Sequence, residues 1–362
     1  MVNERTVFEK YRSERSSDLA LAVYITRHSV SAVLYDIKLE RRFSRCVQFG
    51  VNISPDNALA CIGSAVLRVM RESGTSGNAV KKLGFAAPVD ITMLIEETLT
   101  PTELFLPPDV ELTMLPMLSA ALGGDFTAVL ANAMQRESSV LAADVTGGFR
   151  AAGHVGGKLK FIYIPMKGGL DCCGLESGMP LESGAIDELS REPDGTLCYS
   201  VIGDGDSMGI SAPAAAGAVK LMLESGALDR DGIMTDRDLF YIGEDYYISQ
   251  QDVRAVQSDI AVCRAALELF GRANGRTDRA IISGEAFGSE RGAALMAELG
   301  AVPEGLAEKY GWSRNPGEQG IIECLTKPEL LDELHRLCGS AEDISADISG
   351  EFNELYIKYL GF

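Results

Sequence analysis

The stretch 248–270, ISQQDVRAVQSDIAVCRAALELF, constrains the fold more than any other part of this sequence. Ser249 followed three residues later by Asp252 has the spacing of a capping box, with Asp in place of Glu. Apolar side chains then recur at steps of three and four: Val253, Val256, Ile260, Cys263, Leu267 and Phe270. The pattern predicts an amphipathic helix at about 250–271, and a purely structural helix is its simplest interpretation.

The first third of the chain indicates strands followed by a helix. Residues 19–50 alternate apolar and polar positions in three runs that short polar turns separate, as adjacent β-strands do. A helix is then expected at 54–70, where Ser54 can cap it and Pro55 suits its first position. A strand is expected at 81–88. Prolines forbid a long helix within 98–120, and helical spacing resumes at 123–135.

A second strand opening begins at Val140. VLAADV and KLKFIYIP are expected to form strands around a turn at Gly147 and Gly148. Further expected elements are helices at about 212–226, 288–299, 326–338 and 345–360 and a strand near 279–283. Because strand hairpins open both halves, at Leu21 and at Val140, the chain of 362 residues is expected to form two related lobes.

Composition and charge exclude several classes of function. With 52 acidic and 33 basic residues the net charge is −19, which disfavours nucleic acid as a partner, since phosphate backbones require clustered Lys and Arg. No apolar run is long enough to span a bilayer, and the charged first residues lack the apolar core of a signal peptide. We therefore expect a cytoplasmic protein without a membrane segment, whose oligomeric state the sequence leaves open.

Cysteines and histidines give little sign of a metal site. None of the eight cysteines forms a C-x-x-C pair, so reduced thiols are expected and a metal site is not. Cys172 and Cys173 are adjacent in a Gly-rich loop, which leaves a redox pair as an open possibility. His154 is expected in a turn and His335 on a helix, both with ordinary surface or core roles.

Several segments, taken in order, resemble one known family. ISQQDVRAVQ resembles the signature I-T-Q-x-D-[IV]-R-x-[VL]-Q of the reductive activators of corrinoid proteins. That family belongs to the superfamily of acetate and sugar kinases, heat-shock chaperones and actin. The other matching segments are the hairpins at 21–36 and 140–148, ESGMPLESGAI at 176–186, AIISGEAFGS at 280–289 and the closing SGEFNELYIKYLGF at 349–362. The similarity covers roughly residues 19–362.

The resemblance implies an α/β, two-lobed, actin-like ATPase fold made of two ribonuclease-H-like halves. We expect a flexible N-terminal arm at 1–18, a first ribonuclease-H-like lobe at 19–137, and a second one with C-terminal helices at 138–362. Activators of this family carry electrons through an iron–sulfur domain beside the ATPase region. Residues 1–18 are too short for one and no cysteine cluster follows, so no iron–sulfur cluster is expected in this chain.

In this superfamily two hairpin turns hold the phosphates of ATP, each beginning with an Asp that orients Mg²⁺ or the attacking water. The first turn of the family reads D-I-G-T-T, and this chain has Tyr24-Ile25-Thr26-Arg27-His28 there. Tyr24 cannot supply a carboxylate to hydrated Mg²⁺, and Thr26 obstructs the close backbone approach that Gly permits. The first turn is therefore expected to have lost its phosphate contacts.

The second turn is better preserved. Asp144-Val145-Thr146-Gly147-Gly148 resembles D-I-G-T-N-G, although a strand-end Asp in an ordinary β-turn is an equal alternative. The family segment A-G-P-A-F-E-G corresponds to MKGGLDC, residues 166–172, in which Asp171 keeps the acidic position and Lys167 adds a positive charge. The residues expected to contact a cofactor are Asp144, Thr146, Gly147, Lys167, Gly168, Gln257 and Gly284, and Asp144 and Asp171 are the catalytic candidates if the chain is active.

The phosphate loop of the family, G-I-C-G-S-G, corresponds to GISAPA at 209–214. Pro213 removes one N–H donor, and Ser211 is placed simply to cap the helix that follows. The Lys that the family has within its long helix corresponds to Ile260. Losses at three phosphate contacts imply a protein that has kept its fold without needing ATP hydrolysis.

The leading prediction is a non-hydrolysing or weakly hydrolysing binding or regulatory protein that acts with a corrinoid protein or a corrinoid methyltransferase. The alternative is an ATP-dependent reductive activator of a corrinoid protein that uses Asp144, Thr146 and Asp171 and takes electrons from a separate ferredoxin. A small-molecule kinase is a weaker third candidate, since the first Asp is missing. ATP with Mg²⁺ is the implied cofactor, although the degraded turns argue against it.

A change of ligand is a further alternative, in which Arg27, His28 and Lys167 would meet another anion. Because all of these readings share one fold, the fold alone cannot discriminate among them. Whether the chain is an enzyme stays open from the sequence.

Overall fold

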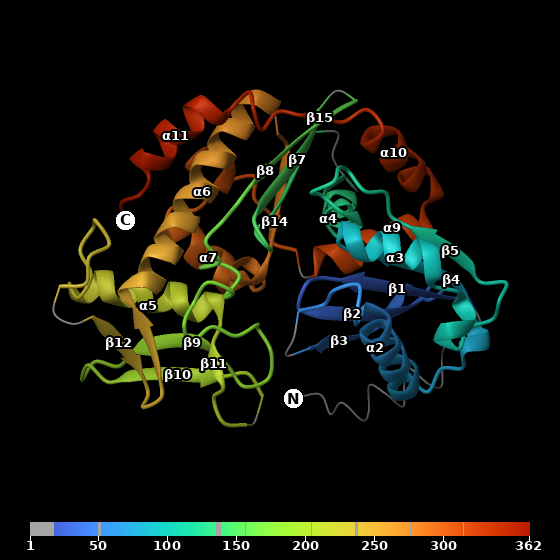
Figure 1. Cartoon of the computed structure of the whole chain (residues 1–362), viewed down its shortest axis with the longest axis horizontal. Coiled ribbons are helices and arrows are strands. Elements are labelled where there is room, and N and C mark those ends of the chain that lie inside the picture. Colours follow the sequence, from blue (N-terminus) through green and yellow to red (C-terminus); the bar gives the residue numbers. More distant parts are fainter. Residues whose placement is uncertain are drawn as a thin grey trace. The chain divides into compact units, whose positions relative to one another are not determined.

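The computed structural model describes residues 18–49, 52–134, 139–155, 157–203, 205–235, 238–275, 277–313 and 315–362. These residues form two compact units (Figure 1). Unit 1 comprises residues 18–134 and Asn315–Ala341, and unit 2 comprises residues 139–313 and Glu342–Phe362. Apart from Asp18, the expected N-terminal arm lies outside the described residues, as does the expected boundary at 137 and 138.

Unit 1 is built on a sheet with the strand order β3-β2-β1-β4-β5. Its strands are β1 (Leu19–Ile25), β2 (Ser29–Asp36), β3 (Arg41–Gln48), β4 (Val80–Ala86) and β5 (Glu111–Met114). The first three strands are antiparallel neighbours, whereas β4 runs parallel to β1 and β5 parallel to β4. The three strands expected at 19–50 and the strand expected at 81–88 are confirmed.

Helix α2 (Ala58–Ser73) packs against β2 and β3, but it begins at Ala58 rather than at Pro55. Its N-cap is Asn57, whose side-chain oxygen accepts a hydrogen bond from the Ser54 N–H at 2.9 Å. The Ser54 carbonyl accepts from the Ala58 N–H, also at 2.9 Å. Ser54 therefore closes a turn ahead of the helix, and its expected role as cap is wrong.

Unit 1 also contains the helices α3 (Val89–Thr98), α4 (Gly124–Met134), α9 (Pro316–Thr326) and α10 (Pro328–Cys338). Helix α9, which was not expected from the sequence, packs against α4, β1 and β4. A Cβ at Gly320 would lie only 1.8 Å from the Ala128 carbonyl oxygen, so the two helices meet through a glycine. This close packing groups Asn315–Ala341 with unit 1, whereas the sequence had assigned 138–362 as one continuous lobe.

Unit 2 repeats the arrangement with the strand order β14-β6-β7-β8-β15. Its strands are β6 (Val140–Asp144), β7 (Phe149–Val155), β8 (Lys158–Ile164), β14 (Arg279–Ser283) and β15 (Glu342–Asp343). The expected strands at VLAADV and KLKFIYIP are confirmed, and β7 lies between them. His154 belongs to β7, paired with Val140 and Leu159 and only 6% exposed, so its expected place in a turn is wrong.

The long helix α6 (Gln250–Asn274) contacts β7 and β8, and α11 (Ser349–Lys358) packs on α6. The predicted capping box is present: the Asp252 N–H donates to Ser249 Oγ, and Asp252 Oδ2 accepts from the Ser249 N–H at 2.8 Å. Each unit thus has three antiparallel strands, then a helix, then a strand that pairs in parallel with the first. This is the ribonuclease-H-like order that the sequence predicted.

A segment of small elements is inserted in unit 2 between β8 and α6. It contains β9 (Ala185–Arg191), β10 (Leu197–Val201), β11 (Gly209–Ile210), α5 (Ala212–Ser225), β12 (Leu239–Ile242) and β13 (Tyr246–Ser249). Unit 2 also contains α7 (Glu290–Glu298) and α8 (Glu304–Ala307). Of these only α5 and α7 were expected from the sequence.

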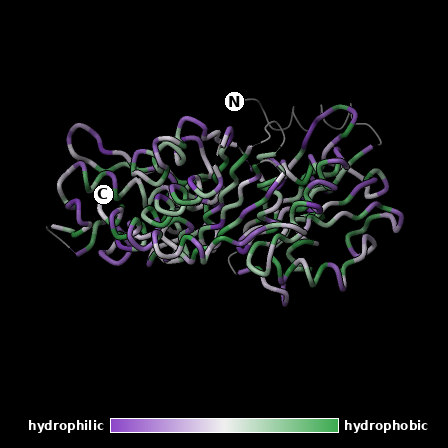
Figure 2. The backbone as a smooth tube through the Cα atoms, turned by 90° about the horizontal axis from the view of Figure 1, so that it is seen from above, coloured by the Kyte–Doolittle hydropathy of each residue, from purple (hydrophilic) through white to green (hydrophobic). Residues whose placement is uncertain are grey.

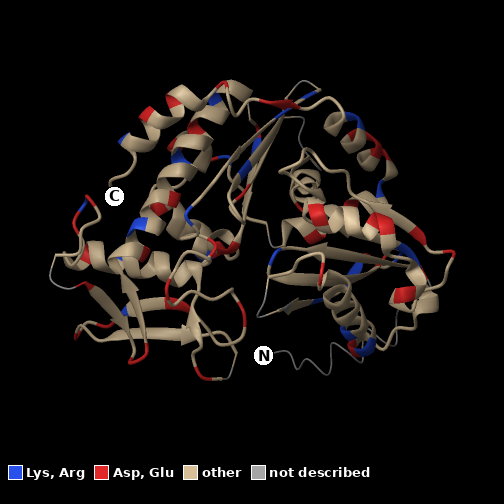
Figure 3. Ribbon diagram, viewed as in Figure 1, with Lys and Arg blue, Asp and Glu red and all other residues tan. Residues whose placement is uncertain are grey.

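Each unit has its own apolar core. Hydrophobic and hydrophilic residues are interspersed along the backbone of the chain (Figure 2). Acidic residues are spread over both units, so the net charge of −19 is not gathered in one segment (Figure 3). Among the described residues no helix is both long and apolar enough to cross a bilayer.

Candidate functional site

The second hairpin turn, between β6 and β7 in unit 2, is the centre of the candidate site. Asp144 ends β6 and is 2% exposed. Gly147 and Gly148 follow with φ values of 67° and 133°, a region that favours glycine. The Thr146 N–H donates to Asp144 Oδ2 at 3.0 Å, so the turn folds back onto the carboxylate. The predicted residues Asp144, Thr146 and Gly147 therefore lie together.

Arg150, which the sequence did not single out, forms a buried ion pair with Asp144. The strand register places the two residues opposite each other, and Arg150 Nη2 lies 2.5 Å from Asp144 Oδ2. Their side chains are only 9% and 2% exposed. Ser283 Oγ donates to the other carboxylate oxygen at 2.5 Å. Protein donors thus occupy both oxygens, and the negative charge is compensated.

Asp171, the second acidic candidate, supports the same turn from another loop. Its Oδ2 accepts from the Gly147 N–H at 2.9 Å, and its Oδ1 accepts from the Cys173 N–H at 3.3 Å. Asp171 is 5% exposed. Gly168 of this loop has a φ of 84°, and a Cβ there would lie 2.6 Å from the Gly174 nitrogen. The Asp171 carboxylate therefore holds the turn by accepting from the backbone of Gly147. Gly168 lets the supporting loop pass close to Gly174.

Asp259 on α6 holds the loop in place and was missed from the sequence. Its carboxylate accepts from the N–H groups of Lys167 and Gly169 at 2.7 Å each and of Leu170 at 3.3 Å. Burial raises the pKa of Asp259 to about 6, opposed by these three hydrogen bonds and assisted by the charge of Asp171. The available signal was an acidic residue directly beside the predicted apolar stripe of the helix.

Lys167 and Gln257, both predicted cofactor contacts, line an open cavity of about 610 Å³ together with Arg254 and Tyr356. Gln257 is 1% exposed and fully used: its Oε1 accepts from Arg254 Nη1 at 2.6 Å, and its Nε2 donates to the Asp231 carbonyl at 3.1 Å. Among the described residues that line this cavity, none comes from the β6–β7 turn. Lys167 and Gln257 are thus brought together, but at a different place from Asp144.

Gly284 lies directly against the turn. Its φ is 115°, and a Cβ there would come within 2.3 Å of Val145 Cγ2. The Val145 N–H donates to the Ser283 carbonyl at 3.1 Å, which keeps the end of β14 beside the turn. Gly284 therefore lies beside Val145 of the turn. Its predicted contact with a cofactor stays a prediction.

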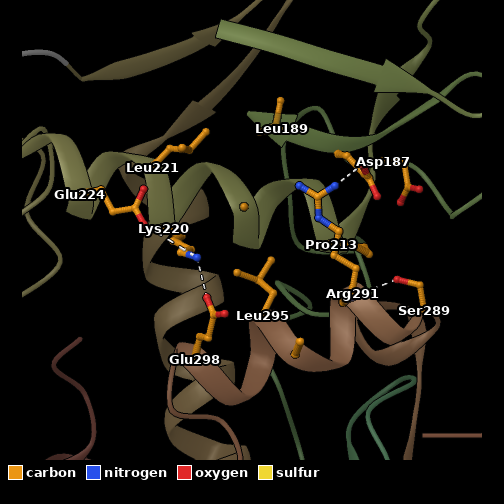
Figure 4. A pocket seen from close by; sticks show the side chains of 14 residues that line it. Asp187, Leu189, Pro213, Lys220, Leu221, Glu224, Ser289, Arg291, Leu295 and Glu298 are labelled. Carbon is orange, nitrogen blue, oxygen red and sulfur yellow. Dashed lines mark hydrogen bonds and ion pairs between the residues drawn. The ribbon is translucent and has the colours of Figure 1, made fainter. Parts of the chain in front are cut away.

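A pocket of about 190 Å³ lies between β9, α5 and α7 (Figure 4). Apolar side chains line it, among them Leu189, Leu221 and Leu295, and charged pairs lie at its rim. Lys220 Nζ lies 2.5 Å from Glu298, joining α5 to α7, and Arg291 pairs with Glu188 and so joins α7 to β9. Burial raises the pKa of Asp187, which also lines the pocket.

The first hairpin turn, between β1 and β2 in unit 1, is closed by its own side chains. Thr26 Oγ1 accepts from the Ser29 N–H at 3.0 Å, and Arg27 Nη1 lies 2.9 Å from Asp90 Oδ2. A Cβ at Gly317 would lie 2.2 Å from the Tyr24 ring, so that ring packs directly against the start of α9. The positions where the family has Asp, Gly and Thr are thus occupied by contacts within unit 1.

The start of α5 is likewise an ordinary helix N-terminus. Ser211 Oγ accepts from the Ala214 N–H at 3.3 Å, and Pro213 in the first turn has no N–H. Ser211, Ala212 and Ala214 are at most 1% exposed. The predicted cap is confirmed. Among the described residues, no group of three or more His, Cys, Asp or Glu side chains could hold a metal ion.

Comparisons with known proteins show what this chain is similar to. A curated relative, the corrinoid activation enzyme RamQ of Eubacterium limosum, is 28% identical over 235 residues, which cover 56% of this chain and 39% of RamQ. The solved structure of a reductive activator for a corrinoid, iron–sulfur protein superposes with a TM-score of 0.76 at 14% identity, covering 97% of this chain and 66% of that one. The chain therefore spans less than two thirds of either protein.

The structural match supports the predicted fold, an α/β actin-like fold with two ribonuclease-H-like halves. A family model described as the C-terminal domain of RACo, the ASKHA domain, matches residues 169–362. This chain belongs to that family, the reductive activators of corrinoid proteins within the ASKHA superfamily, as its sequence motifs predicted.

Proposed function

We propose that this chain is a binding or regulatory protein of the corrinoid-activator family that hydrolyses ATP weakly or not at all. It acts with a corrinoid protein or a corrinoid methyltransferase, and we place that action in the cytoplasm. Support for the partner comes from the relatives, which are named as a corrinoid activation enzyme and as a reductive activator for a corrinoid, iron–sulfur protein.

The buried ion pair between Arg150 and Asp144 carries the proposal. A catalytic Asp of this superfamily must offer an oxygen to hydrated Mg²⁺ or to the attacking water. Here Arg150 compensates the charge of Asp144 and Ser283 takes its other oxygen. A guanidinium held against the carboxylate also repels a divalent cation. The residues present therefore do not fit a catalytic Mg²⁺ at this turn.

The first turn supports the same proposal by a separate route. The Tyr24 ring packs on α9, Arg27 is paired with Asp90, and Thr26 caps its own turn. Neither a carboxylate nor a flexible glycine backbone is left to face a phosphate there. The alternative of a different anionic ligand is also weakened, because Arg27, one of the three cationic groups that would meet it, is already paired with Asp90.

Calorimetric titration of a cobalamin-loaded corrinoid protein into the chain, with and without Mg·ATP, tests the partner. We expect saturable binding whose affinity changes by less than about threefold when nucleotide is added, because a ligand shifts an equilibrium only through differential affinity. Absence of heat and of co-elution with the corrinoid protein in both conditions would remove the proposed partner. A strict requirement for Mg·ATP would argue for the alternative below.

The alternative function is an ATP-dependent reductive activator that receives electrons from a separate ferredoxin, with Asp144 and Asp171 as catalytic residues. One observation favours it: Gly147 keeps its positive φ, and a Cβ there would meet nothing within 4 Å, so the turn is open to a close ligand. Replacing Asp144 with Ala should then abolish reduction of the corrinoid protein in a ferredoxin-coupled assay. Equal reduction by both proteins would end this reading.

A further inference from the structure

Cys172 and Cys173 form a thiol pair in the loop that supports the candidate turn. Neither is disulfide-bonded; Cys172 is buried, at 4% exposed, and Cys173 is exposed. Cys173 directly follows Cys172 in the chain. A hydrogen bond with Cys173, burial and the nearby carboxylate of Glu285 raise the pKa of Cys172. An accessible thiol thus lies beside a buried one that has an acceptor for its proton.

The backbone at Cys172 is unusual. Its φ is 61°, in the left-handed region that L-residues rarely occupy, and such positions tend to be retained where they serve a function. The Leu175 N–H donates to the Cys172 carbonyl at 3.1 Å, and a Cβ at Gly178 would lie 2.2 Å from the same oxygen, so the loop closes tightly around this residue. A cysteine is therefore held where a glycine would be easier to accommodate.

We propose that Cys173 and Cys172 form a reversible thiol–disulfide exchange site for low-molecular-weight disulfides of the glutathione type. The Cys173 thiolate attacks one sulfur of the small disulfide, forming a mixed disulfide and releasing one thiolate. Cys172 then gives its proton to Glu285, and its sulfur attacks Cys173 Sγ and expels the second thiolate. The two cysteines are oxidised to one disulfide, and the small disulfide is reduced to two thiols.

The product is expected to be easily reduced again. Adjacent Cα atoms across a trans peptide are about 3.8 Å apart, shorter than the roughly 4.4–6.8 Å of ordinary disulfides. The resulting strain makes such a bond a labile rather than a structural one. Excess small thiol should therefore restore both cysteines.

Oxidation is expected to reach the turn through one hydrogen bond. The Cys173 N–H donates to Asp171 Oδ1, while Asp171 Oδ2 accepts from the Gly147 N–H. Closing a ring between the two sulfurs must rotate the Cys173 backbone, which moves the Asp171 carboxylate. The redox state of the pair is thereby coupled to the β6–β7 turn, whatever ligand that turn takes.

Mass spectrometry of the full chain treated with oxidised glutathione tests the proposal. After acid quenching and labelling with N-ethylmaleimide, trypsin releases residues 168–191, which carry Cys172 and Cys173 and no other cysteine. We expect this peptide to lose two hydrogens, to take up no label, and to regain two labels after dithiothreitol. The tryptic peptide 46–68 carries the exposed Cys46 and the buried Cys61, which are not adjacent in the chain; it should show a mixed disulfide on Cys46 without closing a disulfide, and so serves as the control.

Two variants separate the steps. Cys172→Ser should retain glutathione on Cys173, because the resolving thiol is gone, whereas Cys173→Ser should leave Cys172 free to take the label. A wild-type peptide that keeps glutathione as Cys172→Ser does, or that takes up two labels after treatment, would overturn the proposal. Faster hydrogen exchange at Gly147 in the oxidised chain is expected from the coupling, and unchanged exchange there would refute that coupling.

Discussion

The two hairpin turns of this chain have the same place in their units but are built differently. The β1–β2 turn of unit 1 has replaced the residues of the family, and Arg27 and Asp90 form a half-exposed pair beside it. The β6–β7 turn of unit 2 keeps Asp144 and has two glycines, with one Gly position of the family pattern shifted, but Arg150 neutralises that carboxylate in a buried site. Under the proposed function, an acidic residue in the right place does not suffice for catalysis when a neighbouring strand supplies its counter-ion.

The ion pairs at the two turns should also contribute differently to the free energy of unfolding. An exposed pair contributes little to stability, because water and salt screen it. A buried pair costs much when it is broken on one side, because the remaining charge has lost its partner. Substitutions at the two pairs should therefore differ in their effect on stability.

Replacing Arg150 with Met should lower the free energy of unfolding by about 3–5 kcal/mol, because Asp144 would be left buried and unpaired. Urea denaturation followed by circular dichroism measures the change. The double variant Asp144→Leu with Arg150→Met removes both charges and should recover most of the loss. A cost below about 1 kcal/mol for Arg150→Met would show that the pair is not buried in solution.

Asp259, which holds the loop that supports the second turn, should make the stability of the protein depend on pH. The folded pKa of about 6 lies above the ordinary aspartate value, so the folded state binds this proton more tightly. Its contribution is fully present below about pH 4 and is lost as the pH rises through about 6. The loss should amount to about 3 kcal/mol at most.

Urea denaturation of the wild type and of Asp259→Asn across that range checks this. The Asn variant mimics the neutral carboxyl, so the difference between the two proteins should shift towards the variant as the pH rises. Curves that stay parallel from about pH 4 to about pH 7 would contradict a raised pKa at this site.

Of two glycines at or beside the second turn, Gly284 has no room for a side chain and Gly147 does. Replacing Gly284 should therefore lower stability more than replacing Gly147. Gly284→Ala combines a φ of 115° with a Cβ 2.3 Å from Val145 and should cost about 2 kcal/mol or more. Gly147→Ala, whose φ is 67° and whose Cβ would meet nothing within 4 Å, should cost about 1 kcal/mol. Thermal denaturation distinguishes them, and equal losses would mean that packing against Val145 is unimportant.

The smallest effect is expected at the first turn. Arg27→Ala breaks a pair whose side chains are 42% and 41% exposed, and should change stability by less than about 1 kcal/mol. The same chemical denaturation series measures it beside Arg150→Met. A loss comparable to that of Arg150→Met would erase the distinction between the two turns.

Local patterns predicted the elements that carry strong periodicity. The capping box of Ser249 and Asp252, the apolar stripe of α6 and the alternating strands β1 to β3 all appear where expected. Helix α9 was missed, because a Pro and two glycines within Pro316–Thr326 lower the helix propensity of a segment that packing on α4, β1 and β4 stabilises. Strand β7 was missed because FRAAGHV has few of the large β-branched residues that mark a strand.

The site was predictable in its backbone but not in its charge balance. Hydrogen bonds hold Asp144, Thr146, Gly147 and Asp171 together, and their role towards a ligand stays a prediction. Arg150 faces Asp144 only through the pairing of β6 with β7, and the sequence pattern does not predict β7. The position of Lys167 in the sequence does not predict where it lies in the fold. It lines a cavity away from the turn, and its backbone N–H donates to Asp259.

Release of phosphate from Mg·ATP, measured with a coupled colorimetric assay in the presence of a cobalamin-loaded corrinoid protein, tests the central claim most directly. With Asp144 neutralised by Arg150, the wild type should release phosphate at the rate of the buffer, and Asp144→Asn should behave identically. Saturable, magnesium-dependent release that is lost in Asp144→Asn would contradict the account.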